Sequence, residues 1–378
     1  MENSKMRLLI LFFVVFSAGI SEGADTGTTA ANFLKLGIGP RAIAMGEAQV
    51  GLADDVYAAY WNPAGLALLK LPEAGFVQNQ YIQDISEQYL AYADPRTSLG
   101  TFAGSVTYLN VGKFQGYDAT GQPAGSVGAS DAAFALSYAS TYFGDRRMGS
   151  GLSVGMTGKY LQERLDTVSA KAFAADAGLL ITPGKRWDGV LDGWEAGVVV
   201  RNVGSALRYD QESFDLPRSI DTGLSYTGTW RQESFTLAVD GRQPSAGRRS
   251  YGAGLELHTL HFLLLRAGYT TQGDLGNGLR LGGGLRFNTV QVDYAYAGAG
   301  EFGGAHRIGL TLRFGKMPED PQYAAQRWYE KGLKDYNKKR FTEALVEFNK
   351  ALEIDPSHPE ALKMMKKTYE EIKTMVPE

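Results

Sequence analysis

Between about residues 74 and 314, the chain alternates apolar residues with polar or very small ones in short stretches. Each stretch ends at Gly, Asp, Asn or Pro. The last stretch is the clearest. Its apolar face consists of Ile308, Leu310, Leu312 and Phe314, and its polar face consists of Arg307, Gly309, Thr311 and Arg313. Side chains of a strand point alternately to opposite faces, so one face can meet lipid while the other lines a polar lumen. The pattern predicts an all-β transmembrane barrel.

The alternation predicts about fourteen antiparallel strands, and an even number returns the last strand to the side where the first begins. Charged residues such as Arg280 and Asp293 share the presumed inner face with small residues. A soluble β-sandwich would also alternate, but with fewer exposed aromatic residues. The expected strands are residues 74–82, 87–93, 97–109, 131–142, 151–161, 171–181, 194–203, 220–229, 235–241, 251–258, 261–270, 278–287, 290–297 and 306–314.

The N-terminus has the layout of a secretory signal peptide. Two basic residues precede an apolar run over residues 8–20, and small residues follow it. Cleavage is predicted near Gly23 or Ala24, which makes residues 1–24 the signal peptide. A membrane anchor is the alternative, but the run is shorter than the roughly 20 residues that a membrane helix needs. No later run is long enough either, so strands would place the protein in the membrane.

Composition narrows the chemistry. The chain has 378 residues, no cysteine and a net charge of −3. Without cysteine, a lipid anchor on cysteine, disulfides and thiolate metal sites are excluded. Nucleic-acid binding needs a clustered basic face, which this charge does not indicate. We therefore predict no nucleic-acid partner.

No catalytic or metal-binding motif appears in the sequence. The four histidines lack a metal-ligand spacing such as His-Glu-x-x-His. Two possible carboxylate pairs, Asp54 with Asp55 and Asp240 with Asp293, are more simply explained as solvated or luminal charges. The sequence predicts no enzyme activity, cofactor or metal.

Residues 25–72 are dense in Gly and Ala and neither alternate nor form a long helical pattern. Asn62 suits an N-cap and Pro63 a first helical position, so a short helix is expected from there to about Leu69. The segment is either an ordinary soluble extension or a plug folded into the lumen. Small residues on the inner face of the barrel favour the plug, a luminal hatch ahead of a barrel over residues 73–315.

Residues 316–378 turn helical and strongly charged. A further helix is expected over residues 359–373, in the manner of a capping helix. Roughly three repeats are needed to bury a continuous core. A single repeat is therefore expected to pack against the barrel rim, a second copy of the chain or a partner protein. The positions expected to bind a partner are Trp328, Tyr336, Phe341 and Phe348. The segment matches one tetratricopeptide repeat of about 34 residues at Trp328, Gly332, Tyr336, Phe341, Ala344, Phe348, Ala351 and Pro356.

Three segments of the sequence, residues 36–46, 61–66 and 199–204, resemble the PorV/PorQ family of outer-membrane proteins. That family is similar to the FadL transporters of hydrophobic compounds, which have a fourteen-stranded barrel and an Asn-Pro-Ala element in a luminal hatch. The resemblance implies that Asn62, Pro63 and Ala64 line or gate a route for apolar cargo. The alternative is that they only shape a turn that anchors the plug. The C-terminal repeat departs from simple FadL proteins.

The resemblance and the alternation lead to two functional hypotheses. The first is an outer-membrane barrel, surrounded by lipid, that handles or transports hydrophobic small molecules. The second is a component of a protein secretion or surface-assembly machinery that binds periplasmic or secretion proteins through its tail. An outer-membrane structural protein without transport is a third possibility. In each case the location is the bacterial outer membrane, with both termini periplasmic.

Overall fold

A computed structural model describes residues 29–375 except 82–84, 118–119, 145–149, 184–190, 211, 231–232, 273–275, 299, 316–320 and 356–357. The predicted signal peptide and Pro356 lie outside the described residues. The chain divides into two compact units, which meet in sequence at Gly315 and Lys316.

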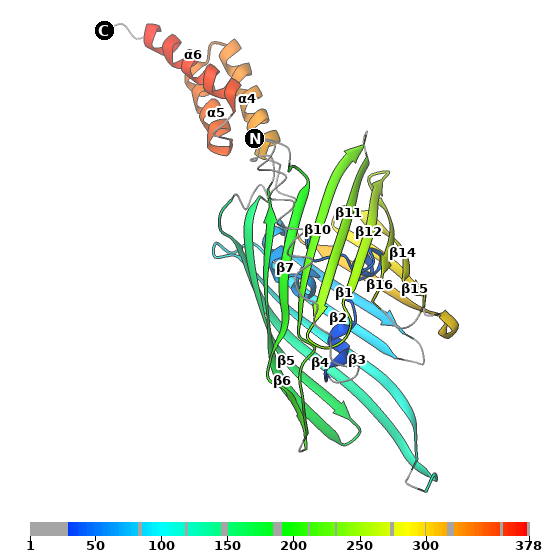
Figure 1. Cartoon of the computed structure of the whole chain (residues 1–378). Helices are drawn as coiled ribbons and strands as arrows, with labels where there is room; N and C mark the ends of the chain where they lie inside the picture. The colour runs from blue at the N-terminus through cyan, green and yellow to red at the C-terminus, as the bar shows by residue number, and fades with distance from the viewer. Residues whose placement is uncertain are drawn as a thin grey trace, which may run out of the picture. The chain divides into compact units, whose positions relative to one another are not determined.

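The first unit contains a closed barrel of fourteen antiparallel strands (Figure 1). β1 and β16 close it, with Glu73 opposite Arg313. All fourteen expected strands are therefore confirmed. The strands are β1 (Glu73–Gln80), β2 (Ser86–Asp94), β3 (Thr101–Tyr117), β4 (Pro123–Thr141), β5 (Gly151–Leu165), β6 (Val168–Thr182), β7 (Trp194–Gly204), β10 (Ser219–Trp230), β11 (Glu233–Pro244), β12 (Ser250–Thr259), β13 (Leu263–Thr270), β14 (Leu279–Phe287), β15 (Val290–Gly298) and β16 (Gly304–Arg313).

The strands β3 and β4 are longer than the sequence indicated. A register shift between Asn110 and Lys113 interrupts the alternation there, so the pattern ended too early. β3 continues past the last residue that pairs with β2, and β4 to β6 extend with it. This end of the barrel, where turns join β3 to β4 and β5 to β6, is named the long-strand mouth. β1 begins and β16 ends at the opposite end.

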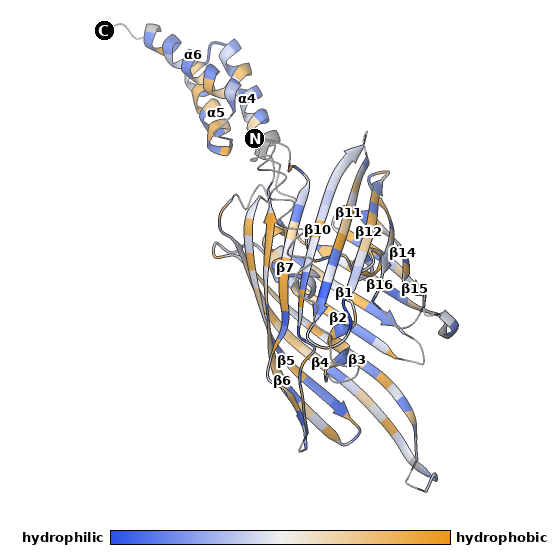
Figure 2. Ribbon diagram, viewed as in Figure 1, coloured by the Kyte–Doolittle hydropathy of each residue, from blue (hydrophilic) through white to orange (hydrophobic). Residues whose placement is uncertain are grey.

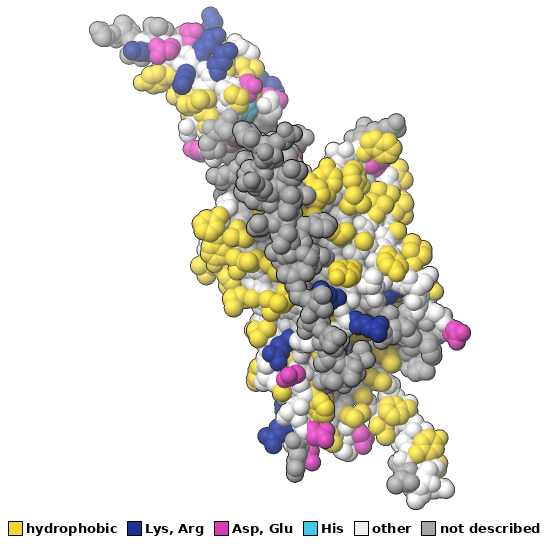
Figure 3. All heavy atoms as spheres, viewed as in Figure 1, with side chains coloured by type: hydrophobic (Ala, Val, Ile, Leu, Met, Phe, Trp, Pro, Cys, Tyr) yellow, Lys and Arg dark blue, Asp and Glu magenta, His cyan; other side chains and the backbone are white. Residues whose placement is uncertain are grey.

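The two faces of the wall differ as predicted. In β6 every second residue is buried, from Ala170 to Thr182, whereas outward residues such as Phe173 are exposed. Apolar and polar residues alternate along the ribbons (Figure 2), and hydrophobic side chains cover much of the barrel wall seen in Figure 3. The outward face is thus an apolar surface suited to lipid.

A short hairpin, β8 (Leu207–Tyr209) with β9 (Glu212–Phe214), lies outside the barrel sheet. It falls in the connection between β7 and β10, at the long-strand mouth. Its Leu207 is buried with Phe33 and Leu161 in one apolar cluster. The sequence did not predict this hairpin, because strands of three residues are too short to show a period of two.

The N-terminal segment, residues 29–71, folds against the inner face of the barrel and is mostly buried. α2 contacts β13 to β16, while η2 contacts β3 to β6, so the segment reaches well-separated parts of the wall. Thr29 pairs with Asp215 at the long-strand mouth, and the segment then leads to β1 at the other end. Its helices are η1 (Asn32–Lys35), α2 (Pro40–Ala44), α3 (Ala58–Trp61) and η2 (Pro63–Leu68); η4 (Gly300–Phe302) lies between β15 and β16.

The second unit is three helices: α4 (Pro321–Asn337), α5 (Phe341–Ile354) and α6 (Pro359–Met375). α6 is the helix expected after the repeat. α4 and α5 approach closely at Gly332, where a Cβ would lie 2.7 Å from Cδ1 of Phe348. Among the described residues, no helix combines the length and the apolar character needed to cross a membrane.

Candidate functional site

The Asn-Pro-Ala element lies at the centre of the contacts between the N-terminal segment and the wall. Asn62 caps η2, which is the expected short helix in 3₁₀ form: its Oδ1 accepts from Ala64 N at 3.2 Å. Its Nδ2 donates to Val50 O at 3.0 Å and to Leu179 O of β6 at 3.1 Å. Both amide hydrogens of this fully buried side chain, and one lone pair of its oxygen, are therefore used in holding the segment to itself and to the wall.

Glycines on the inner face of the wall give the segment room. A Cβ at Gly155 of β5 would lie 2.2 Å from the carbonyl carbon of Pro63, and one at Gly178 of β6 would lie 2.1 Å from Asn62 Oδ1. The same holds across the barrel, where a Cβ at Gly254 of β12 would lie 2.4 Å from Met45 O. The small inner residues that the sequence showed are therefore what lets backbone meet backbone.

A buried cluster of ion pairs joins the segment to β12, β13 and β15. Arg41 donates to both carboxylate oxygens of Glu256, at 3.1 and 2.9 Å, and also pairs with Asp54 and Asp55. Glu256 also accepts from Arg266 at 2.5 Å, and Arg266 donates onward to Asp293 at 2.6 Å. Barrel and segment thus share one network of charges.

A second cluster lies where a β-bulge turns two consecutive residues of β7 inward. Arg201 and Asn202 are both buried, because the register with β6 shifts beside them. Arg201 pairs with Asp221 of β10 and lies over the ring of Trp61, 5.5 Å from its centroid. Asn202 Oδ1 accepts from Lys159 Nζ at 2.9 Å. Two of the three segments that carried the family resemblance therefore meet in space.

Burial shifts the ionisation of groups in the segment. It raises the pKa of Asp55, although Arg41 beside it acts in the opposite sense. Burial works against the charged form of Arg41, but the carboxylates Asp54, Glu256 and Asp55 raise its pKa well above the usual value. Burial also raises the pKa of Tyr60 to about 12. Arg41 is thus a permanent cation held by several carboxylates.

A cavity of about 640 Å³ opens at the long-strand mouth, and we name it the mouth pocket. η1, the wall strands β3 to β5 and the β8–β9 hairpin form it. Two carboxylates, Asp131 and Glu163, are the acidic groups in its lining. The rest is mainly apolar or small: Thr29, Ala30, Ala31, Asn32, Phe33, Leu36, Tyr81, Ile85, Leu109, Val111, Tyr209, Phe214 and Ala305.

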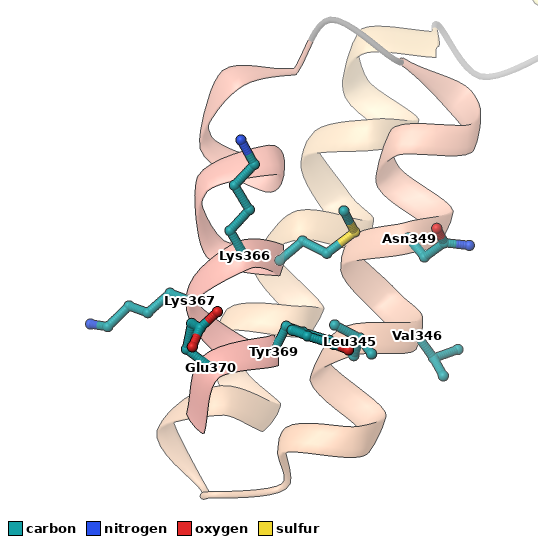
Figure 4. Close-up of a pocket in the computed structure, with 8 residues that line it drawn as sticks. Leu345, Val346, Asn349, Lys366, Lys367, Tyr369 and Glu370 are labelled. Carbon is teal, nitrogen blue, oxygen red and sulfur yellow. The ribbon is translucent and has the colours of Figure 1, made fainter. Parts of the chain in front are cut away.

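The tail unit has a groove of its own, of about 690 Å³, between α5 and α6 (Figure 4). Val346 and Tyr369 line it and are half or more exposed, and Lys366 and Lys367 flank it. The groove is an apolar strip with mainly positive charges at its edge.

The expected partner-binding residues of the tail lie elsewhere. Phe348 is fully buried between the helices, so its side chain has no surface to offer a partner. Phe341 packs on Tyr336, with ring centroids 5.2 Å apart. Trp328 is covered by Lys350, whose Nζ lies 4.4 Å from the ring centroid. These residues mainly hold the three helices together.

Sequence reasoning missed most of the charged sites. The sequence indicated that Asp293 faces inward, but not that it binds Arg266 of β13, which also binds Glu256 of β12. Asp240 and Asp293 do not form a pair: Asp240 accepts from Gln49 N and Val50 N, both at 2.7 Å. The sequence signal that could have revealed these sites is a charged residue at an inward position, with apolar residues on either side of it in the strand. Among the described residues, no cluster of three or more His, Asp or Glu is arranged to hold a metal ion.

Comparison with known sequences decides the family. The model described as "Type IX secretion system protein PorV" matches residues 21–230, more than half of the chain. The chain belongs to the PorV family. Family and fold together make it an outer-membrane β-barrel. Curated proteins include no match to the chain.

Solved structures of hydrocarbon channels share the fold of this PorV-family chain. The CymD monoaromatic hydrocarbon channel is 13% identical, with a TM-score of 0.53 over 75% of this chain and 99% of that one. The toluene transporters TbuX of Ralstonia pickettii and TodX of Pseudomonas putida are 14% and 11% identical, with TM-scores of 0.52 and 0.51. They cover 74% and 73% of this chain and 99% and 97% of their own. At such identities the likeness shows the barrel architecture alone.

Proposed function

We propose that this protein handles apolar cargo at the outer membrane by binding it in the mouth pocket. The pocket is the observation that carries this proposal: it is lined mostly by apolar side chains, including Phe33, Leu109 and Phe214. Ligand sites are typically concave and mostly apolar, with a few polar groups that fix orientation. CymD, TbuX and TodX are named as channels or transporters of aromatic hydrocarbons, which supports apolar cargo.

In this proposal the N-terminal segment is a plug, with Asn62, Pro63 and Ala64 as its anchor. Its contacts with well-separated parts of the wall favour a receptor, or a channel that opens only when the plug moves, over a permanently open pore. The long-strand mouth would face outward, because the longest connection between barrel strands, residues 205–218, lies there and the longer loops of such barrels are extracellular. The tail would then be periplasmic.

Binding of a small apolar probe tests the proposal. Hexanol titrated into the purified full-length protein in lipid nanodiscs should bind with a dissociation constant of about 1 mM, from burial of its six carbons. Ala30→Trp fills the mouth pocket and should abolish binding, whereas Ala175→Trp on the outer face of β6 should not. Calorimetry that finds no hexanol binding, or equal binding by Ala30→Trp, would exclude this site.

A second candidate function is a role in protein secretion, favoured by the family. The tail groove would bind an amphipathic helix of a partner that carries acidic residues, because Lys366 and Lys367 border an apolar strip. In stacked helical repeats, each repeat covers an apolar face of its neighbour. In this tail, Leu362 and Tyr369 of α6 remain exposed. A partner helix would cover that strip.

Photo-crosslinking in intact cells tests this second candidate. A crosslinker at Val346 should capture a peptide with apolar residues at helical spacing and acidic neighbours, identified by mass spectrometry. The matched position Lys334, exposed on α4, should not capture that peptide. Capture of a second copy, or of lipid alone, would contradict the proposed occupant.

A further inference from the structure

Two carboxylates of the mouth pocket lie directly opposite each other on neighbouring strands. Asp131 of β4 is paired in register with Glu163 of β5. Both point inward, since Ala133 and Leu161, two residues along each strand, are buried on the inner face. Like charges directly opposite in a sheet are destabilising. Positions that break such a local rule are expected to be functional or strained sites.

Within the described part of the chain, this pair differs from Glu256 and Asp293, which form ion pairs with Arg41 and Arg266. Neither Asp131 nor Glu163 forms an ion pair with a described residue. Glu163 instead accepts a hydrogen bond from the hydroxyl of Tyr209 on the β8–β9 hairpin. Lys35, on η1, donates to Thr29 Oγ1 at 2.9 Å. The described lining of the pocket therefore holds two acidic side chains and no lysine or arginine.

Beside the carboxylates, the cavity wall is apolar and aromatic. Phe33 comes from η1, Leu109 and Val111 come from β3, and Phe214 comes from the hairpin. The cavity volume of about 640 Å³ is within the range of sites for small organic ligands. Such a wall suits an apolar stem, while the carboxylates suit a positive end group.

We propose that the mouth pocket recognises an apolar stem that ends in a cation, an ammonium or a guanidinium, held by Asp131 and Glu163. This inference rests on the proposed function and narrows its cargo. Charge-assisted hydrogen bonds to the cation would relieve the repulsion between the carboxylates. The same chemistry can come from a free amine amphiphile or from a lysine or arginine side chain in a protein segment.

Three probes with the same stem test the charge preference. Hexylamine, hexanol and hexanoate are titrated into the full-length protein in nanodiscs by calorimetry at neutral pH. Hexylammonium should bind about tenfold more tightly than hexanol, because a hydrogen bond to a charged group is worth more than one to a neutral group. Hexanoate should bind more weakly than hexanol. Equal affinity for the amine and the alcohol would overturn the inference.

Isosteric variants assign the preference to the pair. Asp131→Asn and Glu163→Gln should each remove most of the preference for hexylammonium over hexanol. Asp166→Asn, in the turn that joins β5 to β6 at the same mouth, should keep the preference. If a variant does not form a barrel, the preference of the wild type for hexylammonium is measured in 0.05 M and in 0.5 M salt. The Debye length falls from about 14 Å to about 4 Å between these two concentrations, so the preference should decrease. A preference that persists in the variants, or that salt leaves unchanged, would overturn the inference.

The outcomes separate this inference from the function on which it rests. If hexanol binds without a preference for the amine, the apolar site stands and the cation preference fails. If none of the three probes binds, both fail. A leucine-rich peptide with one lysine, compared with its norleucine analogue, identifies the source. Tighter binding of the lysine peptide than of hexylamine supports a protein segment, and the reverse supports a free amphiphile.

Discussion

Arg41 of the N-terminal segment and Glu256 of β12 form a two-point ion pair, with Nε–Oε2 and Nη2–Oε1 distances of 3.1 and 2.9 Å. The two residues are 215 positions apart in the sequence. Both side chains are buried, and the same carboxylate also binds Arg266. The pair therefore links the segment to the part of the wall opposite its Asn-Pro-Ala element.

Arg41→Ala should loosen the N-terminal segment. It removes one partner of a buried pair and leaves Glu256 and Asp55 short of a cation, a loss of about 3–5 kcal/mol. Frequent channel openings in planar bilayers are the expected readout. Arg96→Ala is the control: Arg96 pairs with Asp94 at 2.6 Å but is exposed, so its loss should leave stability and conductance close to those of the wild type. Wild-type conductance in Arg41→Ala would contradict the role of the pair.

Gly155→Ala should destabilise the folded protein by about 1–3 kcal/mol, because the added Cβ overlaps the backbone at Pro63. Gly158→Ala is a matched control on the same strand, with nothing within 4 Å of its Cβ. The temperature at which the folded band disappears in heat-shift electrophoresis measures the difference. Equal temperatures for the two variants would show that Pro63 does not press on β5.

Asn62→Asp should be more harmful than Asn62→Ala. The carboxylate cannot donate to Val50 O and Leu179 O, and it would bury a charge next to two carbonyl oxygens. Asn62→Ala leaves those acceptors unsatisfied at a cost of about 1–3 kcal/mol. Asn277→Asp is the control, because Asn277 Oδ1 only accepts, from Leu279 N at 3.1 Å. Unfolding in urea measures the stability of all three variants. An Asn62→Ala protein that is less stable than Asn62→Asp would contradict the donor role of Asn62.

Phe348→Ala should unfold the tail unit, with a loss of about 3–5 kcal/mol, because Phe348 is fully buried against Gly332. Val346→Ala, on the same helix and 50% exposed, should change little. Limited proteolysis of the full-length protein measures the effect as faster cleavage within the tail, while the barrel fragment stays intact. Resistance of Phe348→Ala to cleavage would contradict its place in the core.

Several features of the fold follow from local sequence alone. The alternation in β6 and in β16 has a period of two whatever the rest of the chain does, so strand positions could be predicted from it. Asn62 followed by Pro63 is likewise a local start signal for a helix. Where the local pattern lapses, as at the register shift after Asn110, the prediction of β3 ended too early.

The contacts that matter for function depend on which residues meet across the barrel. The sequence showed charge at inward positions such as Asp293, but the partners of those charges lie on other strands or on the N-terminal segment. Arg41 meets Glu256, and Asp131 faces Glu163, only because strand order and register bring them together. A period of two tells which face a side chain takes and carries no information on what lies across the lumen, since that is set by closure of the sheet and by packing.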